Sequence, residues 1–202
     1  LRDRRGGEAP PLVLQAELTL DKPWVGDAAA ERPEPMRWSL RADAAPLGAH
    51  VELHVGVSPL APSPTLDAEL KMTGFDTTRL TEVLPSLATR LRGDARQLEA
   101  SAQLHVQLQL RRRDVTRFDL GRPFGFEVHV SDVALRDAAT ERTFASVTAI
   151  DVVARSFDPR SGDLLLHSVD IDEPGFAAKR DSDGMHAAGF VLLAGTTEPA
   201  AS

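Results

Sequence analysis

Cysteine and tyrosine are absent from this chain of 202 residues, and all aromatic residues together make up only 5%. The lack of cysteine excludes disulfides, thiolate metal sites and cysteine nucleophiles. No run of about 18 apolar residues occurs, so no segment is expected to cross a membrane as a helix. Lys and Arg number 23 against 30 Asp and Glu, and the resulting net charge of −7 argues against a nucleic-acid partner.

A signal peptide is also missing, and the chain begins with Leu1 instead of Met. We therefore expect the chain to be a piece of a longer protein, with any targeting segment outside it. The length suffices for one domain, or two small ones, with a buried core.

Apolar residues at every second position fill much of the chain. The alternation runs through residues 12–20, 36–42, 50–57 and 66–72, and most clearly through residues 99–110. A period of two predicts half-buried antiparallel strands. A strand as long as the last of these spans about 40 Å, which favours an extended sheet over a compact sandwich.

The alternation skips one position at several places and then resumes. Between residues 128 and 137, Val128 and Val130 are followed by Val133 and Leu135, and the same skip occurs within residues 164–173 and 70–75. A β-bulge would keep both halves of such a strand on one face. The predicted bulges are Ser131–Asp132, His167–Ser168 and Thr73–Gly74; the alternative is that each skip marks the end of a strand.

Bulges bend long sheets, so the fold class predicted is mainly β, with a long, curved antiparallel sheet that forms an open groove or half-barrel. One short helical segment is expected near residues 77–92, with Asp76 as its N-cap, an interruption at Pro85 and an end near Gly93. We interpret it as a cap over one end of the sheet; the alternative is an amphipathic helix lying on a membrane. Residues 21–35 and 58–64 are expected to be loops.

Residues 130–193 carry a recognisable series of elements. A short strand ends at Asp137, a longer strand with its turn occupies 145–162, and a phase-shifted strand leads to the Pro174–Gly175 pair and the "RDSDG" hairpin at 180–184. This series resembles the repeat of AsmA-like proteins, the family that includes TamB and related domains of unknown function. The chain departs from the family at 156–163, where family members have a larger aliphatic stretch.

The resemblance implies a division into an upstream β segment (1–97), an AsmA-like β repeat (98–193) and a linker (194–202). It also implies a periplasmic location in the cell envelope, with a tether to the inner membrane outside this segment. The implied function is lipid transport or outer-membrane biogenesis through an apolar β-groove. The implied partners are phospholipid or another acyl lipid, together with other envelope-assembly proteins.

The groove would be lined by the apolar face of the sheet, where no catalyst is needed. The residues predicted to line it are Leu104, Val106, Leu108, Leu110, Phe124, Phe126, Val128, Val130, Ile150, Val152, Leu164 and Leu166. Burying a chain of about 16 methylenes is worth about 12 kcal/mol, at about 0.8 kcal/mol each, which is the barrier that a lone lipid meets on leaving a membrane. A continuous apolar face would offset most of that barrier, so lipids could slide along it.

Catalytic and metal-binding patterns are sparse. His50 and His54 would share one strand face about 13 Å apart, too far for one metal, and His105 and His129 fall on polar faces where they are expected to be solvated. Asp181 and Asp183 precede a glycine but lack the later Glu of a calcium loop, which favours a hairpin. We expect no enzyme activity, no metal and no cofactor.

Two other functions stay open at this stage. The chain could be a non-catalytic structural or interaction β-module of an envelope protein, with its apolar face closed as an ordinary core. It could also be a piece of an outer-membrane barrel, although the absence of Tyr and the presence of only two Trp disfavour the aromatic girdles of such barrels. The first alternative differs from a lipid groove in whether the apolar face is covered.

Overall fold

The computed structural model describes residues 11–22, 35–111, 113 and 119–193, and these form two antiparallel sheets and a short helical segment. The large sheet has nine strands: β1 (Val13–Lys22), β2 (Met36–Ala45), β3 (Ala49–Ser58), β4 (Thr65–Phe75), β6 (Leu98–Gln109), β7 (Phe124–Asp137), β8 (Arg142–Phe157), β9 (Leu164–Asp172) and β10 (Gly175–Phe176). The small sheet consists of β5 (Leu91–Gly93), β11 (Ala178–Arg180), β12 (Gly184–Ala187) and β13 (Phe190–Leu193).

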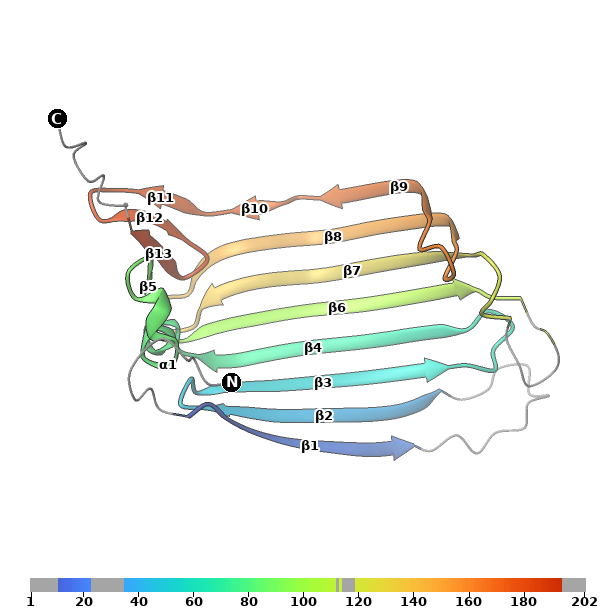
Figure 1. Cartoon of the computed structure of the whole chain (residues 1–202), viewed down its shortest axis with the longest axis horizontal. Coiled ribbons are helices and arrows are strands. Elements are labelled where there is room, and N and C mark those ends of the chain that lie inside the picture. Colours follow the sequence, from blue (N-terminus) through green and yellow to red (C-terminus); the bar gives the residue numbers. More distant parts are fainter. Residues whose placement is uncertain (1–10, 23–34, 112, 114–118, 194–202) are drawn as a thin grey trace.

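The strands of the large sheet lie side by side in the order β1-β2-β3-β4-β6-β7-β8, and both β9 and β10 pair with β8 (Figure 1). The small sheet, in the order β11-β12-β13-β5, lies at one end of the large sheet, beside the helical segment. In the described residues the large sheet does not close into a barrel, because β1 pairs only with β2. The predicted fold class, a long open antiparallel sheet, is confirmed.

All three predicted bulges are present. Two residues of β4 lie between the pairs Met72–Ala100 and Phe75–Leu98, where β6 has only one. In β7 the extra residue lies at Asp132, which has a positive φ of 54°, and in β9 it is His167. The skips are therefore not strand ends.

The bulges keep the apolar residues on one face. On β7, Val130 lies opposite Leu104, and Leu135 lies opposite Ala100. Leu104 and Ala100 are four residues apart on β6 and so share a face. Val130 and Leu135 consequently share that face too, although the plain alternation would have separated them.

The helical segment begins as predicted and ends earlier than predicted. The side chain of Asp76 accepts a hydrogen bond from the Thr78 N–H, 2.9 Å away, and caps η1 (Thr77–Arg79), which leads into α1 (Leu80–Val83). A break at Leu84 precedes η2 (Pro85–Leu87). The expected end near Gly93 is wrong, because Leu91–Gly93 form β5 and pair with β13.

A small core lies where the two sheets meet. Ala95, Leu98 and Phe144 are buried there, and Phe75 and Leu135 pack against them. Thr77 is also fully buried; its hydroxyl accepts a hydrogen bond from the Ala95 N–H and lies within hydrogen-bonding distance of the Ala95 and Gly189 carbonyls. The small sheet and the helical segment are thus fastened to one corner of the large sheet.

The predicted boundary between residues 97 and 98 falls between β5 and β6. The large sheet runs across it, since β4 pairs with β6 along most of its length. The division into an upstream β segment and an AsmA-like β repeat therefore stays a prediction. The predicted linker at 194–202 and most of the predicted loop at 21–35 lie outside the described residues.

Candidate functional site

Apolar side chains form transverse rows along one face of the large sheet. One row consists of Leu20, Trp38, Val55, Ala68, Leu104, Val130, Ile150 and Ile171, each opposite the next on the neighbouring strand. The next row consists of Met36, Val57, Leu66, Val106, Val128, Val152 and Val169. With strands about 4.8 Å apart, such rows extend over roughly 30 Å.

The residues predicted to line a groove fall almost entirely on this apolar face. Those not in the two rows above form two shorter rows beside them. One consists of Leu108, Phe126, Ala154 and Leu166, and the other of Phe124, Phe157 and Leu164, each opposite the next on the neighbouring strand. Phe124 and Phe157 meet edge to face with ring centroids 5.8 Å apart. Leu110 lies just beyond β6, which ends at Gln109. The structure brings the predicted residues together; their role as a lining stays a prediction.

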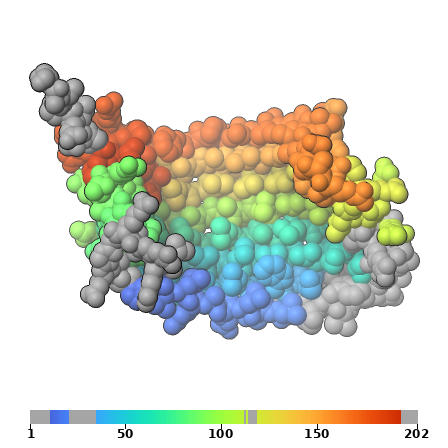
Figure 2. All heavy atoms as spheres, in the orientation of Figure 1, coloured from blue at the N-terminus to red at the C-terminus, as the bar shows by residue number. Residues whose placement is uncertain are grey.

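The apolar face is not covered by another layer of the described chain. Leu18 and Ile171, near its two edges, are 68% and 54% exposed, and Leu70, in the interior, is 42% exposed. In the rows given above only Val55 and Ala154 are buried. Figure 2 shows the sheet as a broad surface between the small sheet at one end and the loops at the other. Exposed apolar patches of this kind mark sites of interaction.

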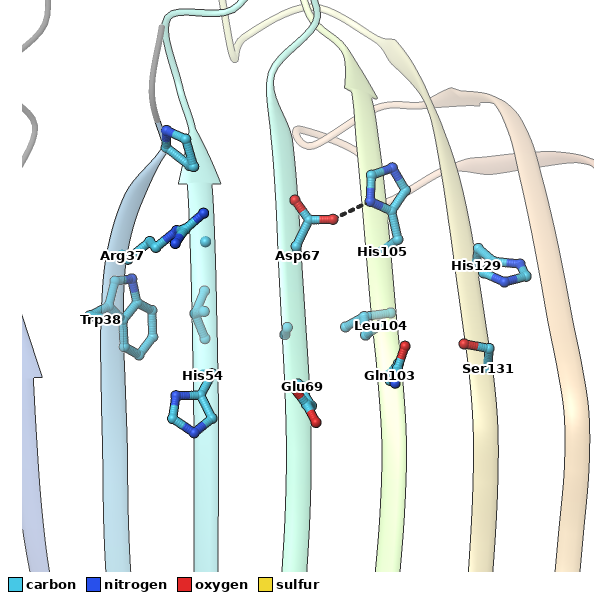
Figure 3. A pocket seen from close by; sticks show the side chains of 14 residues that line it. Arg37, Trp38, His54, Asp67, Glu69, Gln103, Leu104, His105, His129 and Ser131 are labelled. Carbon is cyan, nitrogen blue, oxygen red and sulfur yellow. Dashed lines mark hydrogen bonds and ion pairs between the residues drawn. The ribbon is translucent and has the colours of Figure 1, made fainter. Parts of the chain in front are cut away.

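The opposite face of the sheet is polar, and residues of this face line a pocket of about 720 Å³ together with Trp38, Val55, Ala68 and Leu104 of the first apolar row. Figure 3 shows its polar side chains, which come from neighbouring strands: Arg37, His54, Asp67, Glu69, Gln103, His105, His129 and Ser131. Gly56 lies between Arg37 and Asp67 in the register and has no side chain to fill the space. A glycine inside a strand was the available sequence signal for this hollow.

The histidines of this face are solvated, as predicted, and are paired with carboxylates. His105 is bonded through Nδ1 to Asp67, and the Nδ1 of His129 lies 2.7 Å from Oδ1 of Asp151. Such exposed pairs contribute about 0–1 kcal/mol each. No group of three or more His, Asp or Glu in the described part of the chain could hold a metal ion.

His50 and His54 do not form a site together. The Nδ1 of His50 lies 2.7 Å from Asp43, and its Nε2 lies 3.3 Å from Glu52. The hydrogen bond with Asp43, followed by that with Glu52, raises the pKa of His50 above its ordinary value. His54 instead lines the pocket of the polar face.

His186 forms a cluster with the carboxylates of Asp94 and Asp181 that the sequence did not reveal. Its side chain is only 16% exposed and lies between two acids, with Nδ1 3.2 Å from Asp94 and Nε2 3.0 Å from Asp181. The Nε2 atom has no hydrogen-bond partner among the described residues, and its contact with Asp181 is an ion pair when His186 is protonated. The hydrogen bond with Asp94 raises the pKa of His186 above 6.5.

Asp181 and Asp183 form the predicted hairpin. The Asp181 N–H donates to the Gly184 carbonyl at 3.0 Å, and the Asp183 N–H donates to the Asp181 side chain at the same distance. This backbone hydrogen bond is the main reason that the pKa of Asp181 lies below its ordinary value. The turn joins β11 to β12 and brings Asp181 to His186.

The stability of the small sheet is expected to fall as the pH rises above 6.5. A raised pKa in the folded state means that protonated His186 stabilises the fold below pH 6.5, and that this contribution is lost as the pH rises through the folded-state value. His186→Gln should flatten this pH dependence, measured as urea midpoints between pH 6 and 8. Some of the pH dependence should persist because of His50, so the double variant with His50→Gln is the reference. If His186→Gln leaves the pH dependence of the urea midpoint unchanged, protonated His186 does not stabilise the fold.

Comparisons with known proteins do not assign a family. No family model, no curated protein and no solved structure matches this chain. The resemblance to AsmA-like proteins therefore stays a prediction from residues 130–193. In the described residues no helix is long and apolar enough to span a bilayer.

Proposed function

We propose that the apolar face of the large sheet binds the acyl chains of lipids, as a segment of a periplasmic AsmA-like protein that serves lipid transport or outer-membrane assembly. The observation that carries this proposal is the uncovered set of apolar rows that runs from β1 to β9. The parent protein would be tethered to the inner membrane by a segment outside this chain. Other envelope-assembly proteins are its further proposed partners.

Energetics support an acyl ligand over a polar one on this face. An acyl chain of about 16 methylenes requires about 12 kcal/mol to enter water, at about 0.8 kcal/mol each. Contact with Leu, Val and Ile side chains offsets part of that cost without any polar group to desolvate. The opposite face has rows of Asp, Glu and His and would offset none of it.

A closed interaction module is the alternative function. It requires a layer packed over the apolar rows, and the described part of the chain contains none. An open face also supports sliding, because a lipid can move along a continuous apolar surface without passing through water.

Photo-crosslinking tests the proposal directly. A crosslinking residue is placed at Val106 or Val128, which lie opposite each other on the apolar face. The matched controls are Gln107 and Glu127, the next opposed pair, which lies on the polar face. After incubation with phosphatidylethanolamine and phosphatidylglycerol vesicles, the first pair should yield lipid adducts by mass spectrometry and the second pair should not.

A charge on the apolar face provides an independent measurement. Val128→Asp is expected to lower the amount of co-purified phospholipid about tenfold, which corresponds to about 1.4 kcal/mol. Glu127→Gln on the other face should leave it unchanged. Equal adducts from both faces, or no lipid on either, would overturn the proposal.

A further inference from the structure

The two edges of the large sheet differ in how well they are protected against pairing with another strand. Edge strands present unpaired N–H and C=O groups, and proteins usually shield them with bulges, charges or proline. At one edge, β9 carries a bulge at His167 and the acids Asp170 and Asp172, and Pro174 follows before β10 begins. Since proline has no N–H, this edge is interrupted.

The β1 edge has little of this protection between Val13 and Leu20. These residues pair with β2 without a register shift, contain neither glycine nor proline, and include a single charged residue, Glu17. Leu14 on this edge is 67% exposed. In the described part of the chain, β1 has a partner strand only on its β2 side.

We propose that the β1 edge binds β1 of a second copy of this chain, antiparallel, in a closed two-fold dimer. The sequence of β1 is complementary to itself about an axis at Ala16. The axis places Leu14 opposite Leu18 of the partner copy and Gln15 opposite Glu17. Leucines therefore meet on one face, while on the other Gln15 meets Glu17 and Val13 meets Thr19.

Four other arrangements are less favourable. An axis at Glu17 sets two carboxylates directly opposite each other, which is destabilising. An axis at Leu18 leaves only Ala16–Leu20 in regular pairing, because the register shifts after Leu20. An axis between two residues would place apolar side chains against polar ones. Head-to-tail pairing of β1 with β9 would produce open filaments and is opposed by the interruptions of β9.

The dimer would continue the apolar face of one sheet into the next. The proposal does not depend on lipid binding, because the test uses lipid-free protein. Each chain has a net charge of −7, so repulsion between copies should weaken the dimer at low salt. A dimer that strengthens between low and moderate ionic strength is the expected behaviour.

Single-cysteine variants test the register, because the chain has no cysteine of its own. Ala16→Cys places two thiols opposite each other across the axis, and mild oxidation should give a covalent dimer. The matched control is Ile171→Cys, which is on the same face, also exposed, and on the opposite edge. It should give little covalent dimer.

Light scattering after size-exclusion chromatography measures the mass in solution. The chain is expected at twice its mass, 43.6 kDa against 21.8 kDa, and Ala16→Lys should return it to the monomer because two lysines then face each other. Ala42→Lys, at the position opposite Ala16 on β2, is the control and should leave the dimer intact. A monomeric chain, equal crosslinking of both cysteine variants, or mixed crosslinks between residues 16 and 171 would overturn the proposal.

Discussion

Replacing Phe144 with alanine is expected to lower the free energy of unfolding by about 3–5 kcal/mol. Phe144 is buried at the corner where the small sheet meets the large one, in contact with Ala95 and Leu98. Because the rest of the large sheet is a single layer in the described residues, few other buried groups can compensate. Total stabilities of domains are about 5–15 kcal/mol, so this loss would be a large share.

Urea unfolding followed by circular dichroism measures this effect. The matched control is Phe176→Ala, because Phe176 is 67% exposed on β10 and buries little surface. A surface change of this kind is expected to cost about 0.5 kcal/mol or less. Equal losses from Phe144→Ala and Phe176→Ala would show that the corner is not the core of the protein.

Replacing Gly93 with alanine is expected to destabilise the protein by about 3 kcal/mol, at the upper end of typical overpacking. An added Cβ would lie 2.3 Å from the backbone carbon and oxygen of Thr77. Backbone atoms cannot turn aside as a flexible side chain can, so β5 or the helical segment must move. The pairing of Gly93 with Phe190 on β13 should weaken as a result.

Gly56→Ala is the matched control. Gly56 also lies inside a strand, but the nearest atom to its added Cβ is the Cβ of Pro35 at 4.0 Å, an ordinary contact. The unfolding free energy should change by about 0.5 kcal/mol or less. Hydrogen exchange at β5 and β13 should speed up in Gly93→Ala and not in Gly56→Ala. Unchanged exchange in Gly93→Ala would contradict the predicted strain.

The strands of the large sheet were predictable because their evidence is local. A period of two in residues 99–110 requires only neighbouring side chains, and it predicted β6 to within one residue at each end. The bulges were predictable for the same reason, since a skipped position is visible in the residues of one strand. The N-cap at Asp76 and the break before Pro85 also depend on local backbone chemistry.

The missed features depend on contacts between distant residues. Leu91 falls within the helical segment predicted near residues 77–92, yet it pairs with Leu192 in the small sheet. His186 lies beside Asp94, 92 positions earlier in the chain. No periodicity reports such a pairing, because it arises only when β13 comes to lie beside β5.

By itself the sequence determined that this chain has long strands with one apolar and one polar face, and with bulges at defined positions. Backbone geometry sends alternate side chains to opposite faces, so the pattern is written into consecutive residues. Only the tertiary structure decided that the described residues leave the apolar face uncovered, that the small sheet is fastened to one corner, and that β1 and β9 form the edges. Those outcomes depend on which strands pair and on what packs over them, and both are set by contacts between residues far apart in the chain.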